Sequence, residues 1–189
     1  MNLTPGVAEG SQLALGQKRF AIRGVSQVTG DATVGYYIGD AAIWRPTMTF
    51  APYIRPIGLN RVEIIKGPQS TLYGNGAMGG VMRFIPKEPN LNEIEVDMRL
   101  GYSQTKSAGS NQYADASLSV PLVEDKAAVR LTGSWEERDG WQVGPNGEDD
   151  YGDDEISDLR LQFLAEPTDK LSISFLGVWN ELDTVPGTL

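Results

Sequence analysis

The sequence of 189 residues predicts a mainly β protein, in which a small α+β unit precedes about five long antiparallel strands of the transmembrane type. Its two halves differ in charge: residues 1–91 hold nine Lys and Arg against five Asp and Glu, whereas residues 92–189 hold seven against twenty. The second half also contains five runs of alternating apolar and polar residues, joined by connections of unequal length. These observations predict two units, 1–90 and 91–189.

The composition excludes several classes of function. The chain has no cysteine and no histidine, which excludes disulfide frameworks, Ser-His-Asp triads and most zinc sites. Its formal net charge of −9 argues against non-specific binding to nucleic acid. The sequence contains no run of 18 apolar residues and therefore predicts no transmembrane helix, so membrane residence would require strands.

The first half predicts short strands punctuated by turns. We expect strands over 20–25, 34–40, 61–66 and 81–85, because each is rich in β-branched or aromatic residues. A helical turn is expected over 68–73, with Pro68 near its start. The segment 86–90, PKEPN, ends this unit because proline disfavours a continuing element.

The second half predicts five strands, each with one apolar and one polar face. The runs span 94–103, 113–120, 128–136, 158–165 and 171–180. Such alternation fits a soluble sheet with one wet face, or a transmembrane barrel with a polar lumen.

The connections favour the barrel. Links 104–112 and 137–157 are long, whereas 121–127 and 166–170 are short, as in barrels with short turns on one side of the membrane. The first, third and fifth strands end their apolar faces on Tyr102, Trp135 and Trp179. Aromatic residues at one end of each strand are typical of a membrane interface, so these three are predicted to be lipid-interface aromatics.

Residues 61–89, RVEIIKGPQSTLYGNGAMGGVMRFIPKEP, resemble the plug-domain signature of TonB-dependent outer-membrane receptors. The family pattern runs from a strand with Arg-Val-Glu, through Gly-Pro and Leu-Tyr-Gly, to Gly-Gly-Val and a final strand. Residues 20–25 look like its upstream Ile-Arg-Gly strand. Residues 34–40 look like its central strand, except that Ala41 stands where the family has glycine after Asp40.

The resemblance implies a plug inside a barrel of about 22 strands in the Gram-negative outer membrane. It covers about residues 20–180. Because a complete receptor of the family has an earlier plug segment and many more strands, the chain is expected to be a fragment that holds the C-terminal part of the plug and the first five barrel strands. Five strands are too few to close a membrane barrel, for which about eight is the practical minimum. The resemblance also implies partners, namely the TonB energy-transducing complex, outer-membrane lipid and a small-molecule ligand such as a metal chelate.

Two groups of plug residues are singled out. Plug arginines in the family pair with barrel carboxylates, which implies a polar plug–barrel latch formed by Arg23, Arg61, Glu63 and Lys66, with Glu95, Asp97 or Asp115 among the possible barrel partners. The alternative is an ordinary exposed strand face. The plug turn motif comprises Gly67, Pro68, Leu72, Tyr73, Gly74, Gly79 and Gly80.

Other patterns receive structural interpretations. Gly74, Gly76 and Gly79 match a dinucleotide-binding spacing, but a strand rather than a helix follows them, so tight turns are expected instead. The acidic stretch 148–158 predicts a solvated external loop rather than a calcium site, because its spacing does not match an EF-hand. Trp141, before this stretch, and Tyr151, within it, are possible external loop contacts. No cofactor and no metal are expected.

The sequence thus favours a fragment of an active transporter for a scarce solute, such as a ferric siderophore or cobalamin, with the plug gating the barrel. A soluble plug-like binding module without transport activity is the alternative. A catalytic all-β protein, such as a glycosidase using paired carboxylates, is the third hypothesis, and nothing in the sequence builds a pocket around such a pair.

Overall fold

The computed structural model describes residues 4–10, 19–26, 32–43, 51–74, 76–104, 109–139 and 153–184. Contacts divide the chain into two compact units. The first comprises Met1–Tyr53 and Leu59–Pro86, and the second comprises Ile54–Gly58 and Lys87–Leu189. The short segment Ile54–Gly58, here called the anchor segment, therefore belongs with the C-terminal strands although it lies far from them in sequence.

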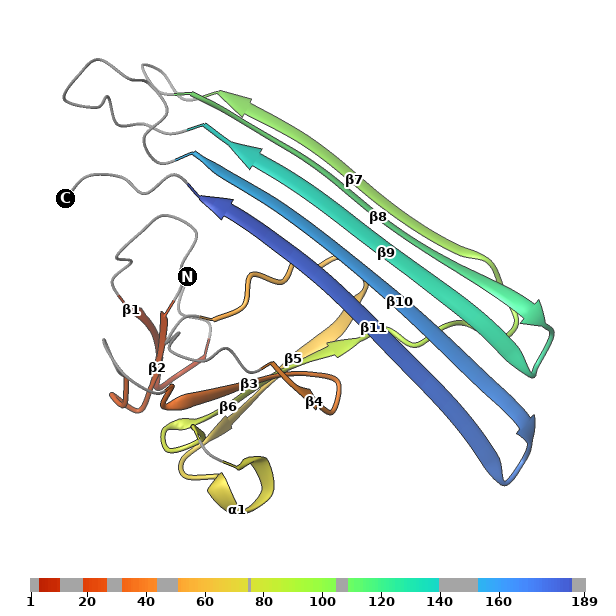
Figure 1. Cartoon of the computed structure of the whole chain (residues 1–189), viewed down its shortest axis with the longest axis horizontal. Helices are drawn as coiled ribbons and strands as arrows, with labels where there is room; N and C mark the ends of the chain where they lie inside the picture. The colour runs from red at the N-terminus through yellow and green to blue at the C-terminus, as the bar shows by residue number, and fades with distance from the viewer. Residues whose placement is uncertain are drawn as a thin grey trace. The chain divides into compact units, whose positions relative to one another are not determined.

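The first unit is built from two small sheets and one helical turn (Figure 1). One sheet has two strands, β1 and β2, and the other has the order β4-β3-β6-β5. Strands β5 and β6 are antiparallel, whereas β3 and β6 run parallel. The bounds are β1 Val7–Gly10, β2 Arg19–Ile22, β3 Val34–Ile38, β4 Ala41–Ala42, β5 Leu59–Lys66, α1 Ser70–Tyr73 and β6 Gly80–Pro86.

The core of the first unit lies on β2, β3 and β6. Its buried apolar side chains are Ile22, Val34, Tyr36, Ile38, Val81, Met82 and Phe84, with Ala77 from the turn before β6. The strands expected over 34–40, 61–66 and 81–85 and the helical turn are confirmed, whereas the strand expected over 20–25 ends at Ile22, because Arg23 and Gly24 form a turn with positive φ. The β-branched and aromatic residues of β2, β3 and β6 form this core.

Tyr36 makes the stability of this core sensitive to alkali. Burial raises the pKa of Tyr36 to about 12, and a backbone hydrogen bond at Phe20 offsets part of that shift. In the unfolded chain the phenol ionises near pH 10, whereas in the folded unit it stays protonated, so stability is lost as pH rises from 10 to about 12. We expect a loss of about 2–3 kcal/mol in the free energy of unfolding over this range.

The Tyr36→Phe variant has no phenol to ionise and should lack this component. Denaturant unfolding at pH 9 and pH 12 measures the difference between the wild type and the variant. If both lose the same free energy, Tyr36 does not carry the alkaline sensitivity.

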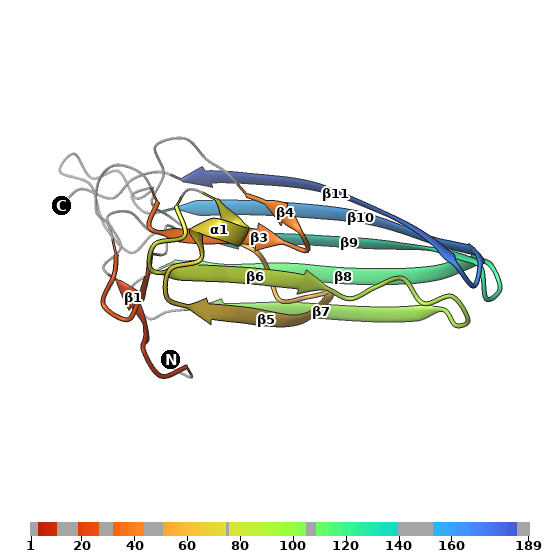
Figure 2. The ribbon, with the colours of Figure 1, turned by 90° about the horizontal axis from the view of Figure 1, so that it is seen from below.

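The second unit is a sheet of five long antiparallel strands in the order β11-β10-β9-β8-β7 (Figures 1 and 2). Each strand pairs with its neighbour in sequence, as predicted. The connections 124–126 and 169–170 are short, whereas 105–109 and 139–153 are longer, so the predicted alternation is confirmed. The bounds are β7 Glu95–Gln104, β8 Ser110–Val123, β9 Ala127–Arg138, β10 Asp154–Thr168 and β11 Leu171–Thr184.

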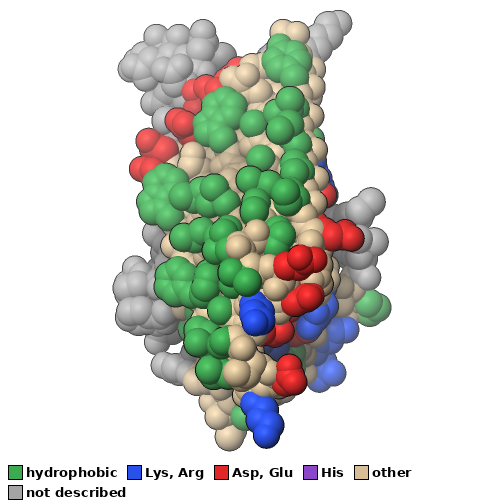
Figure 3. Space-filling view, turned by 90° about the vertical axis from the view of Figure 1, so that its right-hand side faces the viewer, with side chains coloured by type: hydrophobic (Ala, Val, Ile, Leu, Met, Phe, Trp, Pro, Cys, Tyr) green, Lys and Arg blue, Asp and Glu red, His purple; other side chains and the backbone are tan. Residues whose placement is uncertain are grey.

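The two faces of this sheet are inverted relative to a soluble protein. The outer face is apolar and exposed, with Val96, Met98, Leu100, Leu118, Leu131, Leu159, Leu161, Ile173 and Phe175 (Figure 3). The inner face is polar and buried, with Asp115, Ser117, Ser119, Arg130, Thr132, Ser134, Glu136, Asp158, Arg160 and Gln162. A large exposed apolar face of this kind fits lipid and argues against the soluble-sheet alternative.

The register supports one membrane interface for the three aromatic residues. Tyr102 of β7 pairs with Gln112 of β8, which pairs with Glu137 of β9. Trp135 lies two residues before Glu137 on β9. Likewise, Trp135 pairs with Ser157 of β10, which pairs with Glu181 of β11. Trp179 lies two residues before Glu181 on β11. The line that joins the aromatic residues therefore shifts by two residues along the strands for every two strands it crosses. With ordinary rise per residue and strand spacing, this line is inclined by about 35° to the direction across the strands. That slope lies within the usual tilt of barrel strands, and at such a tilt the three aromatic residues would share one height. Their place at a membrane interface stays a prediction.

Candidate functional site

The inner face of the second unit receives the anchor segment through the Arg55 guanidinium. Its Nε donates to Asp115 Oδ1 at 3.1 Å, and its Nη2 donates to Asp115 Oδ2 at 2.9 Å. Its Nη1 donates to Glu136 Oε2, and its Cζ lies 4.6 Å from the centroid of the Tyr113 ring. One arginine thus bridges two carboxylates of neighbouring strands β8 and β9 and stacks on an aromatic ring.

Burial increases the contribution of these ion pairs to stability. The side chains of Arg55, Asp115 and Glu136 are 13%, 1% and 9% exposed. Water therefore screens the pair little, and either partner left alone would be a poorly solvated charge. Glu136 also accepts a hydrogen bond from Arg138 Nε at 2.8 Å, which extends the network along β9.

The backbone of the anchor segment is held from β10. Arg160 Nη2 donates to the carbonyl oxygens of Ile57 at 2.6 Å and of Arg55 at 3.3 Å. Arg160 is itself fixed by Asp158, whose Oδ1 accepts from Nε at 2.9 Å. The anchor segment is irregular and is not part of a β-ladder that would provide donors for these two carbonyl groups. The buried guanidinium of Arg160 therefore provides the hydrogen-bond donors.

Gly58 allows the backbone of the anchor segment to lie close to β8 and β9. Its φ is +63°, and a Cβ at this position would lie 2.7 Å from Thr132 Oγ1 and 3.3 Å from Ser117 Oγ. Only glycine meets both demands, a left-handed backbone and a close approach to β8 and β9.

The Gly58→Ala variant should weaken the second unit by at least about 1–2 kcal/mol, because the positive φ alone costs that much for an L-residue. The clash adds to this cost, and Thr132→Ala should relieve only the clash. Thermal unfolding of both single variants and the double variant tests this. Strictly additive effects would contradict the predicted contact between Gly58 and Thr132.

A second cluster fixes the segment between β6 and β7. Glu95 accepts hydrogen bonds from Asn90 Nδ2 at 2.9 Å and from Arg130 Nη2, and its Oε2 lies 2.8 Å from Lys87 Nζ. Arg130 Nε also donates to the carbonyl oxygen of Glu88 at 3.2 Å. The backbone N–H of Asn90 donates to Ser119 Oγ at 2.8 Å. The inner face of β7 to β9 thus fixes residues 87–95.

The residues predicted as a latch make their described contacts within the first unit. Arg61 and Arg83 both pair with Glu63, at 2.7 and 2.9 Å, and the hydrogen bond from Arg61 is the main cause that lowers the pKa of Glu63. Lys66 Nζ donates to the carbonyl oxygen of Pro5 at 2.6 Å, and the backbone N–H of Arg23 donates to that of Gly6 at 2.7 Å. Their role against a barrel wall stays a prediction.

Sequence reasoning missed Arg55. It did name Asp115 and Glu95 as possible barrel carboxylates, and both accept ion pairs from residues of the chain's N-terminal half, Arg55 and Lys87. The available signal was an arginine before a proline, in YIRPIG, between two strands. An extended residue before proline can project a long side chain away from the chain, but this signal is weak.

The predicted turn motif forms a closed turn between β5 and β6. The backbone N–H of Gly67 donates to the carbonyl oxygen of Gly79 at 3.0 Å, and Tyr37 Oη donates to the carbonyl oxygen of Tyr73. A Cβ at Gly80 would lie 2.3 Å from the carbonyl oxygen of Ile65. Leu72 is largely exposed, and Gly74 follows α1 with a φ of +69°. These glycines serve close packing and turns, as expected.

Three predicted features are only partly described. Trp141 and Tyr151 lie outside the described residues, as do residues 148–152 of the acidic stretch. The prediction of an external loop is wrong for residues 154–158, which begin β10 and bury Asp154 and Asp158. Within the described part of the chain, no group of three or more Asp or Glu side chains is placed to hold a metal ion. In the same residues, no helix is long and apolar enough to cross a membrane.

The chain is similar to known proteins over nearly its full length. The TonB-dependent Receptor Plug Domain family matches residues 1–81. The Ferrichrome outer membrane transporter/phage receptor of Escherichia coli is 29% identical over 97% of the chain and 23% of its own length. The Iron-regulated outer membrane virulence protein of Vibrio cholerae is 28% identical over 61% of the chain and 17% of its own length.

Among solved structures, the ferric yersiniabactin uptake receptor FyuA from Yersinia pestis matches with a TM-score of 0.76 and 21% identity. The match covers 94% of this chain and 27% of that receptor, and at this identity it shows the fold alone. The chain spans about a fifth of the length of the curated relatives it matches.

Residues 1–81 thus match the plug domain of TonB-dependent receptors, and the fold of the whole chain is similar to the plug and part of the barrel wall of a solved receptor. The curated relatives named above are outer-membrane proteins of Gram-negative bacteria and are receptors or transporters rather than enzymes, which agrees with the class that the sequence predicted. The mainly β fold, with a plug unit and an open set of barrel-type strands, is confirmed as well.

Proposed function

We propose that the chain forms the plug and the first wall strands of an outer-membrane active transporter for a ferric siderophore or a comparably bulky solute such as cobalamin. The observation that carries this proposal is the inverted sheet, apolar outside and polar inside, with plug-family residues 54–58 ion-paired to its polar face. The names of the relatives, which include a ferrichrome transporter and a ferric yersiniabactin receptor, support the class of solute.

The polar interface suits a plug that must both seal and move. Arg55, Arg130 and Arg160 hold backbone and side-chain oxygens by charge-assisted hydrogen bonds. Such bonds are strong while dry, yet each partner can be solvated by water when the contact opens. An apolar interface of the same size would offer no such exchange. In the proposed mechanism, ligand binds outside, TonB pulls the plug, and the inner-membrane proton gradient supplies the energy.

Uptake of labelled solutes tests the proposal. Cells that produce the receptor containing this chain are given ⁵⁵Fe-ferrichrome, ⁵⁵Fe-yersiniabactin and ⁵⁷Co-cobalamin, with and without an uncoupler. We expect accumulation of one solute that disappears on deletion of the gene and on collapse of the proton gradient. Accumulation that is unchanged in the deletion strain for all three would contradict the proposal and favour a plug-like binding module.

A further inference from the structure

We propose that Arg99 of β7 is a replacement partner for Asp115, with which it pairs whenever Arg55 leaves the wall. The proposal begins from the charges on the inner face of the second unit. Three carboxylates of this face pair with an arginine of the same sheet, whereas Asp115 pairs with Arg55 of the anchor segment.

The three pairs within the wall show what is missing at Asp115. They are Glu95 with Arg130, Glu136 with Arg138, and Asp158 with Arg160. In each pair, the guanidinium supplies the positive charge that a poorly hydrated carboxylate needs. Asp115 is the exception, since both of its oxygen atoms accept hydrogen bonds from Arg55.

Arg99 is the wall arginine that matches Asp115. The two residues are direct partners in the ladder between β7 and β8. Side chains in such a pair begin about 5 Å apart, a gap that an arginine can bridge. Arg99 is nevertheless exposed, and it forms no ion pair within the part of the chain that the structure describes. The wall thus contains a fourth pair that is not formed while Arg55 occupies the carboxylate.

The aromatic ring beside Asp115 suits either guanidinium. The Cζ atom of Arg55 lies 4.6 Å from the centroid of the Tyr113 ring. The same ring lies over β7, because a Cβ atom at Gly101 would be 2.1 Å from its Cε1 atom. Gly101 follows Arg99 by two residues on the same face of β7. The ring therefore borders the path of Arg99 toward the carboxylate and offers its face to that cation as well.

Exchange of the two arginines keeps the wall electrically balanced. Without any cation, Asp115 would be a charged group with a side chain only 1% exposed, which is a costly state. Arg99 reduces that cost, while Arg138 continues to pair with Glu136. Arg99 replaces only one of the two ion pairs of Arg55, so loss of Arg55 still lowers stability. The inference rests on the proposed function only in that a moving plug is what withdraws Arg55.

Asp97 is the competing carboxylate for Arg99. It lies two residues before Arg99 on the same face of β7, the spacing at which two of the wall pairs form. Asp97 is exposed, however, so water solvates its charge and a cation adds little. Asp115 is buried, and an unpaired charge costs more there.

A double-mutant cycle tests the exchange, with urea unfolding of the receptor in lipid vesicles as the measurement. Arg99→Gln alone should change the ratio of folded to unfolded receptor by less than about threefold, because Arg99 holds no partner while Arg55 is present. In the Arg55→Ala background, the same change should lower that ratio by about tenfold. Equal effects of Arg99→Gln in the two backgrounds would overturn the inference.

Two further variants identify the partner of Arg99 in the Arg55→Ala background. Asp115→Asn should abolish the effect of Arg99→Gln, because the carboxylate that Arg99 binds is gone. Asp97→Asn is the matched control and should leave the effect at about tenfold. The opposite outcome would assign Arg99 to Asp97 and would overturn the inference.

Charge rescue separates a lost cation from lost packing. The sequence has no cysteine, so Arg99→Cys introduces the first thiol into it. In the Arg55→Ala background, a methanethiosulfonate reagent that carries a trimethylammonium group should restore the ratio of folded to unfolded receptor. An uncharged reagent of similar size should not. Equal restoration by the two reagents would contradict a role for the charge of Arg99.

Arg55→Lys keeps the test decisive if Arg55→Ala does not fold. Lysine retains the charge but cannot donate to both oxygen atoms of Asp115 with the fork of a guanidinium. The effect of Arg99→Gln should therefore be larger in Arg55→Lys than in the wild type. No difference between these two backgrounds would overturn the inference.

Failure of this inference differs from failure of the proposed function. If the labelled solutes accumulate but Arg99→Gln has equal effects in both backgrounds, only the exchange is wrong. If the effects differ as expected but no solute accumulates, the exchange is retained and the transport proposal fails.

Discussion

Replacing Arg55 with alanine is expected to destabilise the second unit by about 3–5 kcal/mol, because it removes the guanidinium that pairs with the buried Asp115 and leaves Glu136 with one cationic partner fewer. The loss would exceed that of an ordinary surface ion pair, since the Asp115 side chain is only 1% exposed. Thermal or denaturant unfolding of the receptor in detergent, with resistance to protease as a second readout, measures it.

Arg61→Ala is the matched control. Arg61 also pairs with a carboxylate, Glu63, but its side chain is 55% exposed. We expect no resolvable change in unfolding for this variant, because water and salt screen such a pair. If Arg61→Ala were as damaging as Arg55→Ala, the assignment of the principal ion pair to the anchor segment would be wrong.

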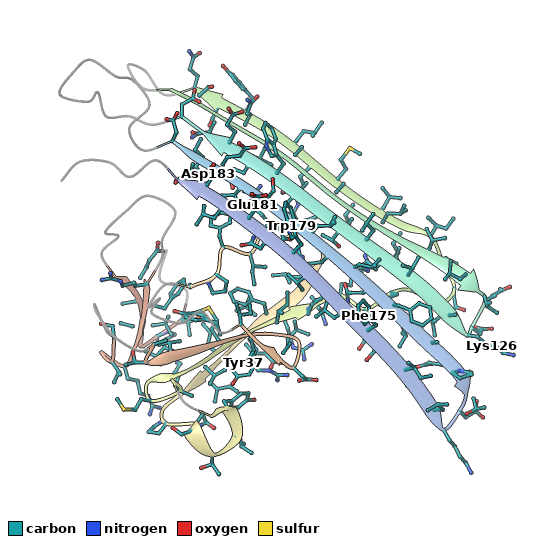
Figure 4. The ribbon with its side chains drawn as sticks, viewed as in Figure 1. Tyr37, Lys126, Phe175, Trp179, Glu181 and Asp183 are labelled. Carbon is teal, nitrogen blue, oxygen red and sulfur yellow. The ribbon has the colours of Figure 1, made fainter. Side chains whose placement is uncertain are left out.

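Replacing Phe175 with lysine is expected to lower stability in the membrane by about 2–4 kcal/mol, the cost of a cation at the midplane of a barrel's lipid face. Phe175 is 58% exposed on the outer face of β11, four residues from Trp179 (Figure 4). Four residues along a strand tilted by about 35° correspond to about 11 Å, close to half of the apolar band.

Ser174→Lys is the control for that variant, because Ser174 is the neighbouring residue on the opposite face of β11. It places the same cation one residue away, toward the lumen. Urea unfolding in lipid vesicles should show a large loss for Phe175→Lys and a small one for Ser174→Lys. Equal losses would show that the two faces of β11 are assigned incorrectly.

The strands were predictable because a membrane barrel repeats the same two-residue alternation. The apolar partners Leu118 and Leu131 in adjacent strands each carry this signal independently. The predicted strands nevertheless ended too early. On β11 the outer positions after Trp179 are Glu181 and Asp183, yet the ladder continues to Thr184 (Figure 4). Alternation in hydropathy ends where the apolar band ends, whereas backbone pairing does not.

The candidate site was less predictable because its residues follow no period. Arg55 lies in an irregular segment, and its partners Asp115 and Glu136 become neighbours only through the register of β8 and β9. A sequence shows that these carboxylates face the lumen, but it cannot show which plug residue reaches them. Gly58 is similar, since only the wall side chain of Thr132 reveals why glycine is required.

The most direct test of the account is a spin-label scan of β11 in the outer membrane, with single cysteines introduced in turn at positions 171 to 179. The account predicts that accessibility to oxygen dissolved in lipid alternates with a period of two and is high at 173, 175, 177 and 179. Uniform accessibility, or high values at 172, 174, 176 and 178, would contradict the assignment of the apolar face to lipid and of the polar face to the lumen.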